Sequence, residues 1–349
     1  MNGLFLGYRD PLFGIITLVA FVFAISFITY SFSLYKEKIA RREYRKLLKR
    51  FELGNLKEDD YVHLYATYNL PFDSIVLLAS TFLYKGEYNK AISVYQALLE
   101  HVNDKVKKEE LLELLGKTYF KGGFLQRAKD IYLQVLKFSP RNEEVLTYLL
   151  YTYEKLKELE NAKEVLNSLE ELGQDIKLEK AYIDTLGVIY NPILSFEKKT
   201  KKLFELFKEN NSIERLLVGF LLRFNKEEFW ENLKLFDLSK HLDLLWFLDF
   251  NDVDFDYVSE SKLLSELYTA KAYINAKEQS DNFVLDVLIA LRKNKSKAKA
   301  DLNFEFICQK CKKVFPMYNT RCPQCHSILS SKVQAVLTRS SLEKNQSLQ

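Results

Sequence analysis

The strongest constraint on the fold is an internal repeat in the first half of the chain. Residues 79–99 and 116–136 align without a gap. In both segments a small residue is followed at the same intervals by an aromatic residue, a glycine, an alanine and a second aromatic residue. The matched pairs are Ala79 and Gly116, Phe82 and Tyr119, Gly86 and Gly123, Ala91 and Ala128, and Tyr95 and Tyr132. Pro140 closes the second unit, and a third unit follows with Leu150, Tyr153, Ala162 and Leu166.

This spacing is typical of a tetratricopeptide repeat, which is a pair of antiparallel helices. The two helices approach closely only where glycine or alanine removes a side chain, and the aromatic residues fill the space to the next unit. The pattern predicts tetratricopeptide repeats over residues 71–175. Residues 176–300 keep amphipathic helical spacing but lose the repeat, so we expect degenerate helical repeats that continue the superhelix. A separate helical bundle is the alternative for that region.

The composition agrees with a mostly helical chain. Only 11 glycines and 6 prolines occur in 349 residues, which argues against a loop-rich β fold and against a glycine-rich nucleotide-binding fold. Gly116-Lys117-Thr118 resembles the end of a phosphate-binding loop, but Leu111 stands where that motif needs a glycine. The sequence contains no catalytic constellation, so we do not expect an enzyme.

An apolar segment near the N-terminus is long enough to cross a membrane. The 25 residues from Pro11 to Tyr35 carry no charge, which predicts a short outer tail and a transmembrane anchor over residues 1–35. Residues 36–50 hold eight basic and two acidic residues, within a predicted basic juxtamembrane helical segment, 36–70. Basic residues favour the cytoplasmic side, so the N-terminus should lie outside and the bulk of the chain inside. A cleaved signal peptide would carry its positive charge before the apolar run.

All four cysteines form two CxxC pairs near the C-terminus. Each pair makes a tight turn that directs two sulfurs to one point, and two such turns make a tetrahedral four-thiolate site. This donor set suits zinc, and iron is the alternative on ligand type alone. The predicted metal ligands are Cys308, Cys311, Cys322 and Cys325, in a metal-binding ribbon over residues 301–331 with a flexible tail at 332–349. His326 directly follows the last cysteine and is expected to be a bystander.

A tetratricopeptide array holds partner proteins along its concave groove, which the first helix of each unit lines. The register predicts which side chains face that groove, and their mixture of charges suits a protein ligand better than a phosphate backbone. The predicted partner-binding residues are Glu110, Glu113, Lys117, Phe120, Lys121, Tyr151, Glu154 and Lys155.

The combination of an anchor, a helical array and a ribbon with two CxxC pairs resembles the lipopolysaccharide assembly protein B family. The resemblance is closest in YKGEYNKAISVYQALL, in LLGKTYFKGGFLQRAKDIYLQVL and in CQKC-x10-CPQC. It implies a mostly α fold, with a transmembrane helix, a tetratricopeptide-type superhelix and a small C-terminal rubredoxin-like zinc ribbon. Two departures stand out: the family usually has glycine where this chain has Lys312, and an aromatic residue where it has Thr320-Arg321.

The resemblance also implies a function without a catalytic step. Members of that family are inner-membrane adaptors that work with a membrane-bound AAA protease to degrade the deacetylase of lipid A synthesis. This chain would then regulate lipopolysaccharide synthesis from the bacterial inner membrane through protein partners. The alternative is a membrane-tethered zinc ribbon that binds nucleic acid through the basic residues 292–300 with Lys310, Lys312 and Lys313. The net charge of only +4 and the anchor argue against that alternative.

Overall fold

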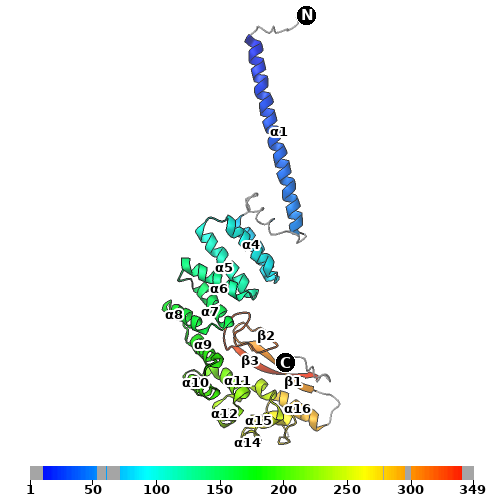
Figure 1. Cartoon of the computed structure of the whole chain (residues 1–349). Coiled ribbons are helices and arrows are strands. Elements are labelled where there is room, and N and C mark those ends of the chain that lie inside the picture. The colour runs from blue at the N-terminus through cyan, green and yellow to red at the C-terminus, as the bar shows by residue number, and fades with distance from the viewer. Residues whose placement is uncertain (1–10, 53–59, 61–70, 278, 295–299, 340–349) are drawn as a thin grey trace. The chain divides into compact units, whose positions relative to one another are not determined.

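The computed structural model describes residues 11–52, 60, 71–277, 279–294 and 300–339 (Figure 1). The chain divides into two compact units, Met1–Tyr148 and Leu149–Gln349.

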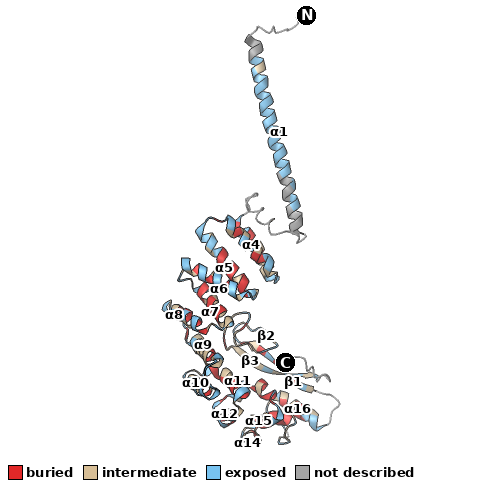
Figure 2. Ribbon diagram, viewed as in Figure 1, coloured by how far each residue is buried: buried red, intermediate tan, exposed pale blue. Residues whose placement is uncertain are grey.

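The first helix, α1 (Pro11–Glu52), contains the apolar segment seen in the sequence. Its stretch Ile15–Ile39 is 25 residues long, which is enough to cross a membrane, and its side chains are exposed along almost its whole length (Figure 2). The helix continues past Tyr35, so the predicted anchor and the start of the predicted juxtamembrane segment form one helix. Residues 53–59 and 61–70 of that segment lie outside the described part of the chain.

Helical hairpins follow, as the repeat predicts. In the first unit they are α3 (Phe72–Tyr84) with α4 (Tyr88–His101) and α5 (Lys105–Lys121) with α6 (Leu125–Phe138). The matched alanines Ala79, Ala91 and Ala128 are completely buried. A Cβ atom added to Gly116 would lie 2.5 Å from the ring of Tyr132, so the small residue is required by the packing of α5 on α6. The predicted repeat register is therefore the observed one.

The third hairpin pairs α7 (Glu143–Leu156) with α8 (Leu159–Glu171), and Leu150, Ala162 and Leu166 are buried in it. The turns inside the three hairpins share one geometry. In each, a backbone N–H donates to the carbonyl five residues earlier over 2.9 Å: Glu87 to Phe82, Phe124 to Tyr119, and Glu158 to Tyr153. The residue before each donor is left-handed, with φ of 78° at Gly86, 79° at Gly123 and 60° at Lys157. Glycine adopts this conformation without strain, which explains the repeated glycine.

The second unit continues with two helices of 14 residues and then with shorter helices of 5 to 11 residues. They are α9 (Lys177–Tyr190), α10 (Phe196–Glu209), α11 (Glu214–Phe224), α12 (Lys226–Glu231), α13 (Leu242–Trp246), α14 (Phe255–Glu260), α15 (Lys262–Ala270) and α16 (Phe283–Lys293). Short 3-10 turns interrupt the region 233–252. After α10 the long hairpins of the repeat are thus replaced by shorter helices around one core.

A three-stranded antiparallel sheet completes this unit, in the order β2-β1-β3. The strands are β1 (Ala300–Cys308), β2 (Val314–Phe315) and β3 (Ser331–Arg339). Leu302, Phe304 and Phe306 point to one face of β1 and join the hydrophobic core of helices α10 to α16. The ribbon therefore shares its core with the helices.

The prediction of a flexible tail over residues 332–349 is wrong for residues 332–339, which form a strand. Residues 331–339 form β3, which pairs with β1 along its whole length. The pairing is specified by apolar residues that alternate on both strands and meet one another, as in Leu302 with Leu337 and Phe306 with Val333. Residues 340–349 lie outside the described part of the chain.

Candidate metal centre

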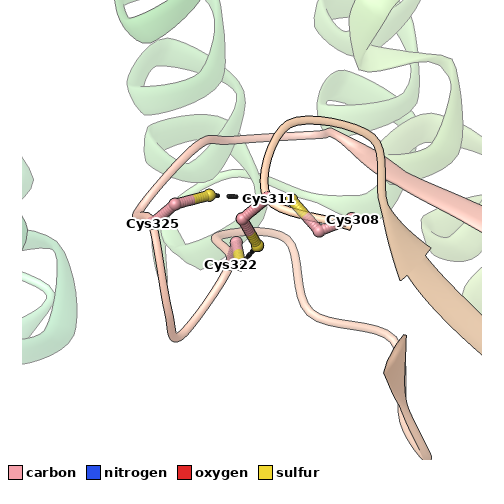
Figure 3. A group of neighbouring side chains, drawn as sticks. All are labelled: Cys308, Cys311, Cys322 and Cys325. Carbon is pink, nitrogen blue, oxygen red and sulfur yellow. Dashed lines mark hydrogen bonds between the residues drawn. The ribbon is translucent and has the colours of Figure 1, made fainter. Parts of the chain in front are cut away.

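The four cysteines come from two facing turns of the ribbon. Cys308 ends β1 and Cys311 lies on the turn to β2, whereas Cys322 and Cys325 lie on the loop that precedes β3. Figure 3 shows the four side chains pointing toward one another. The two predicted CxxC pairs thus converge, as their spacing requires.

The distances between the sulfurs fit one metal ion. All four Sγ atoms lie within 4.8 Å of one another. Cys308 Sγ is 3.6 Å from Cys325 Sγ, and Cys311 Sγ is 3.7 Å from Cys322 Sγ. Four sulfurs arranged tetrahedrally around zinc, with bonds of about 2.3 Å, are about 3.8 Å apart. The residues present therefore fit a tetrahedral metal ion.

The two turns have the same backbone geometry. In the first, the N–H of Lys312 donates to the carbonyl of Cys308 over 2.8 Å, and in the second the N–H of His326 donates to Cys322 over 2.9 Å. Lys312 and His326 are both left-handed, with φ of 61° and 58°. This explains why glycine is usual at the first position in the family that the sequence resembles, because a side chain there is strained.

Two serine hydroxyls lie against the sulfurs. Ser327 Oγ is 3.1 Å from Cys325 Sγ and 3.5 Å from Cys308 Sγ, and Ser330 Oγ is 3.4 Å from Cys308 Sγ. Burial opposes ionisation of Cys308, but the N–H of Cys311 and these two hydroxyls outweigh it and lower the pKa of that thiol to about 5. The Ser327 hydroxyl also lowers the pKa of Cys325. Because a metal binds the thiolate, this environment prepares two of the four ligands.

What the cluster can do follows from its donors. Four protein sulfurs fill a tetrahedral coordination sphere and leave no position for a substrate, which is the arrangement of a structural site. The charge of two or more thiolates must be balanced, and a bound cation does so. No sequence pattern identifies Ser327 and Ser330, because their contacts with the sulfurs depend on how the second turn folds back on the first.

An arginine beside the cluster joins the ribbon to the repeat helices. Arg321, which directly precedes Cys322, is only 7% exposed and lies between two carboxylates. Its Nε is 2.6 Å from Glu154 Oε2 of α7, and its Nη2 is 2.7 Å from Glu179 Oε2 of α9. Its Nη1 also donates to the carbonyl of His326 over 2.8 Å. One side chain thus links the second metal turn to two helices.

Aromatic rings and a tyrosine hydroxyl complete this contact. The Arg321 guanidinium lies 4.2 Å from the ring centre of Tyr151, and the ring of His326 lies 5.1 Å from the same ring. Tyr182 Oη donates to Glu154 over 2.7 Å and lies 3.0 Å from Thr320 Oγ1. Burial lowers the pKa of Arg321, but the carboxylates of Glu179 and Glu154 outweigh it and raise that pKa. The arginine therefore stays charged within a buried ion pair.

The predicted partner-binding residues fall into three groups. Glu110, Lys121 and Lys155 are exposed. Glu113 accepts a hydrogen bond from Asn142, Lys117 Nζ lies 2.7 Å from Glu144, and Phe120 is buried against the ring of Tyr148. Tyr151 and Glu154 face the ribbon. Their role in partner binding stays a prediction.

Sequence reasoning missed the arginine contact. The signal in the sequence was Thr320-Arg321, which stands where the family usually has an aromatic residue, and both residues contact the helices.

For the alternative of nucleic-acid binding, residues 295–299 of the basic stretch lie outside the described part of the chain. Lys310, Lys312 and Lys313 are exposed on the first turn.

Comparisons with known proteins agree with the resemblance seen in the sequence. No family model matches the chain. Lipopolysaccharide assembly protein B of Escherichia coli K12 is 29% identical over 99 residues, which is 28% of this chain and 25% of that protein. The proteins of the same name from the O6:H1 and O157:H7 strains match equally. This chain therefore matches about a quarter of the length of these curated relatives.

A solved tetratricopeptide repeat protein from Parabacteroides merdae superposes on 72% of this chain and 97% of its own, with a TM-score of 0.36 and 14% identity. That similarity is too distant to bear on function. The chain resembles lipopolysaccharide assembly protein B in sequence, and it has the apolar N-terminal helix, the helical repeats and the four-cysteine cluster expected of that family.

Proposed function

We propose that this protein is an inner-membrane adaptor that regulates lipopolysaccharide synthesis by presenting a lipid A deacetylase to a membrane-bound AAA protease. The observation that carries the proposal is the joint presence of three parts: an apolar helix, helical repeats and a four-cysteine ribbon that packs on the helices following those repeats. The match to lipopolysaccharide assembly protein B supports the same process. The protein has no catalytic step of its own in this proposal.

The proposed cofactor is zinc, bound by Cys308, Cys311, Cys322 and Cys325. It would supply a structural cross-link between the two turns of the ribbon.

The proposed orientation places the N-terminus outside and residues after Lys36 in the cytoplasm, because of the basic run 36–50. A cytoplasmic ribbon would also keep its thiols reduced. A reporter enzyme fused after Gln349 should be active only in the cytoplasm, and activity outside would reverse the orientation.

The turnover of the deacetylase tests the adaptor role. In a strain that lacks this protein, the half-life of the deacetylase should lengthen and its level should rise, and the full chain should restore both. Deletion of residues 1–35 should abolish the rescue, because the partner protease is itself in the membrane. Normal turnover in the deletion strain would refute the proposal.

A matched pair of variants tests the concave surface of the repeats. Lys121 is exposed at the end of α5, on the predicted groove, and Lys137 is exposed near the end of α6, the second helix of the same hairpin. Lys121→Glu combined with Glu110→Lys should impair rescue, whereas Lys137→Glu should not. Lys117 is left unchanged because its ion pair with Glu144 would turn into a repulsion that affects folding.

A further inference from the structure

A groove lies between the ribbon and the helices that follow the repeat hairpins, away from the cysteines. It has a volume of about 590 Å³ and is lined by α9, α11 and α13 on one side and by β1 and residues 316–320 on the other. All of these elements belong to the second compact unit. None of the four cysteines lines the groove, so it is a feature separate from the metal centre.

The rim of the groove carries large apolar side chains that face solvent. Phe247 is 69% exposed, Met317 is 72% exposed, and Phe224 and Tyr190 are about half exposed. Aromatic residues and methionine are enriched where protein surfaces bind partners, and methionine adapts its shape to different side chains. Four such residues around one hollow indicate a binding surface rather than scattered exposure.

A glycine in the wall keeps the groove open. Gly219 lies in the middle of α11, where glycine lowers stability by about 1 kcal/mol relative to alanine. Packing does not require it, because a Cβ atom added there would meet nothing within 4 Å. Gly116 in α5 is the opposite case, since its added Cβ atom would clash with Tyr132. At Gly219 the missing side chain leaves space in the groove instead.

One edge of β1 is open along the groove. β1 pairs with β3 from Ala300 to Cys308, but β2 pairs with only Phe306 and Ile307. Pro316 follows β2 directly, and proline has no N–H with which to extend the ladder. Among the described strands, none pairs with residues 302–305 on this edge.

The hydrogen bonds of β1 show which peptide groups face that edge. The N–H of Cys308 donates to Lys313 on the β2 side, and backbone groups alternate between the two edges of a strand. Leu302 and Phe304 therefore direct their N–H groups to the same open side. The N–H of Leu302 donates to its neighbour Asp301 over 2.8 Å, as expected of a group without a ladder partner.

We propose that this groove binds an extended segment of a partner protein, which pairs with the open edge of β1 and places apolar side chains among Phe224, Phe247 and Met317. A strand edge selects an extended peptide through its backbone, and the apolar rim selects alternate side chains. Arg223 gives the preferred charge: it is exposed at the rim and, among the described residues, has no carboxylate within 4 Å. The segment therefore carries an acidic residue. This inference rests on the proposed adaptor function in one respect: both require that the chain binds a protein partner.

A displayed library of random heptapeptides, panned against the full-length protein in nanodiscs, tests the inference. The selected peptides should alternate apolar residues and include an acidic one. Gly219→Phe should weaken their binding about tenfold or more by filling the groove, whereas Gly219→Ala should leave it unchanged. Arg223→Glu should shift the selection from acidic to basic peptides. Equal metal content in all variants shows that the ribbon remains folded.

A second measurement tests the strand pairing itself. Each backbone nitrogen of a selected peptide is methylated in turn. Methylation should abolish binding at every second residue, where the N–H pairs with β1, and should leave binding unchanged at the residues between. If methylation leaves the affinity of the peptide unchanged and anionic lipid vesicles displace it, the proposal is overturned in favour of a lipid site. A library that yields no peptide sensitive to Gly219→Phe would overturn it as well. Loss of the deacetylase role in cells would leave this peptide binding intact, so the two proposals fail separately.

Discussion

At the scale of single residues, Arg321 connects the two parts of the second unit. Its guanidinium is shared by Glu154 of α7 and Glu179 of α9, and the next residue in the chain is the metal ligand Cys322. A buried ion pair of this kind adds little to stability against an apolar replacement, but removal of one partner leaves uncompensated charge. This side chain therefore fixes the second metal turn on the helices, in addition to the core that β1 shares with them.

Arg321→Met should lower the free energy of unfolding of the second unit by about 2–3 kcal/mol, because it removes the counter-charge of Glu154 and Glu179, whose side chains are only 12% and 23% exposed. Trp230 and Trp246 are buried in the core that the ribbon shares, so tryptophan fluorescence during urea denaturation reports on this unit. Arg339→Met, at the exposed end of β3, is the control and should change little. Similar effects of the two changes would mean that the ion pairs do not hold the ribbon.

Lys312→Gly should stabilise the ribbon by about 1 kcal/mol, because it removes the strain of a side chain at a φ of 61°. Lys310→Gly is the matched control, since Lys310 lies two residues earlier in the same turn and has an ordinary negative φ. That change should destabilise the ribbon. The measurement is the urea concentration at which the metal is released. A lower midpoint for Lys312→Gly would contradict the turn geometry.

At the scale of elements, the sequence predicts what short-range spacing controls. The small and aromatic residues of the repeat recur every 34 to 37 positions and identify the hairpins from α3 to α8. The two CxxC pairs likewise locate the cysteine cluster, because each turn is local. β3 was not predicted because its partner β1 lies about thirty residues away, so the alternation of apolar residues in β3 identifies a strand only once that pairing is known. Arg321 is separated from Glu154 by 167 positions in the sequence and from Glu179 by 142. No local sequence pattern predicts ion pairs over such separations.

Two helical glycines give opposite predictions at this scale. Gly116→Ala should lower the thermal stability of the repeats, at about 1–3 kcal/mol, because the new methyl group would overlap the buried ring of Tyr132. Gly219→Ala should raise stability by about 1 kcal/mol through helix propensity alone. Circular dichroism during heating of the detergent-solubilised protein measures both. A shift of the same sign for the two variants would show that the packing of α5 on α6 is misplaced.

At the scale of the whole molecule, the chain combines parts that serve different purposes. The apolar part of α1 is exposed along its length, as a membrane segment requires. The repeats present partly charged helix surfaces, and the ribbon adds a cysteine cluster and a groove to the second unit. A ribbon of this size has too little core of its own, so its order should depend on the metal and on the core that it shares with the helices.

The metal content of the full-length protein tests this account most directly. Native mass spectrometry of the detergent-solubilised chain should show one zinc per polypeptide. Cys322→Ser should lose most of that metal, and its tryptophan fluorescence should show a loosened second unit, because metal binding and folding are coupled. A Cys322→Ser protein that retains one zinc with an unchanged second unit would contradict the four-thiolate centre and the coupling of ribbon to repeats.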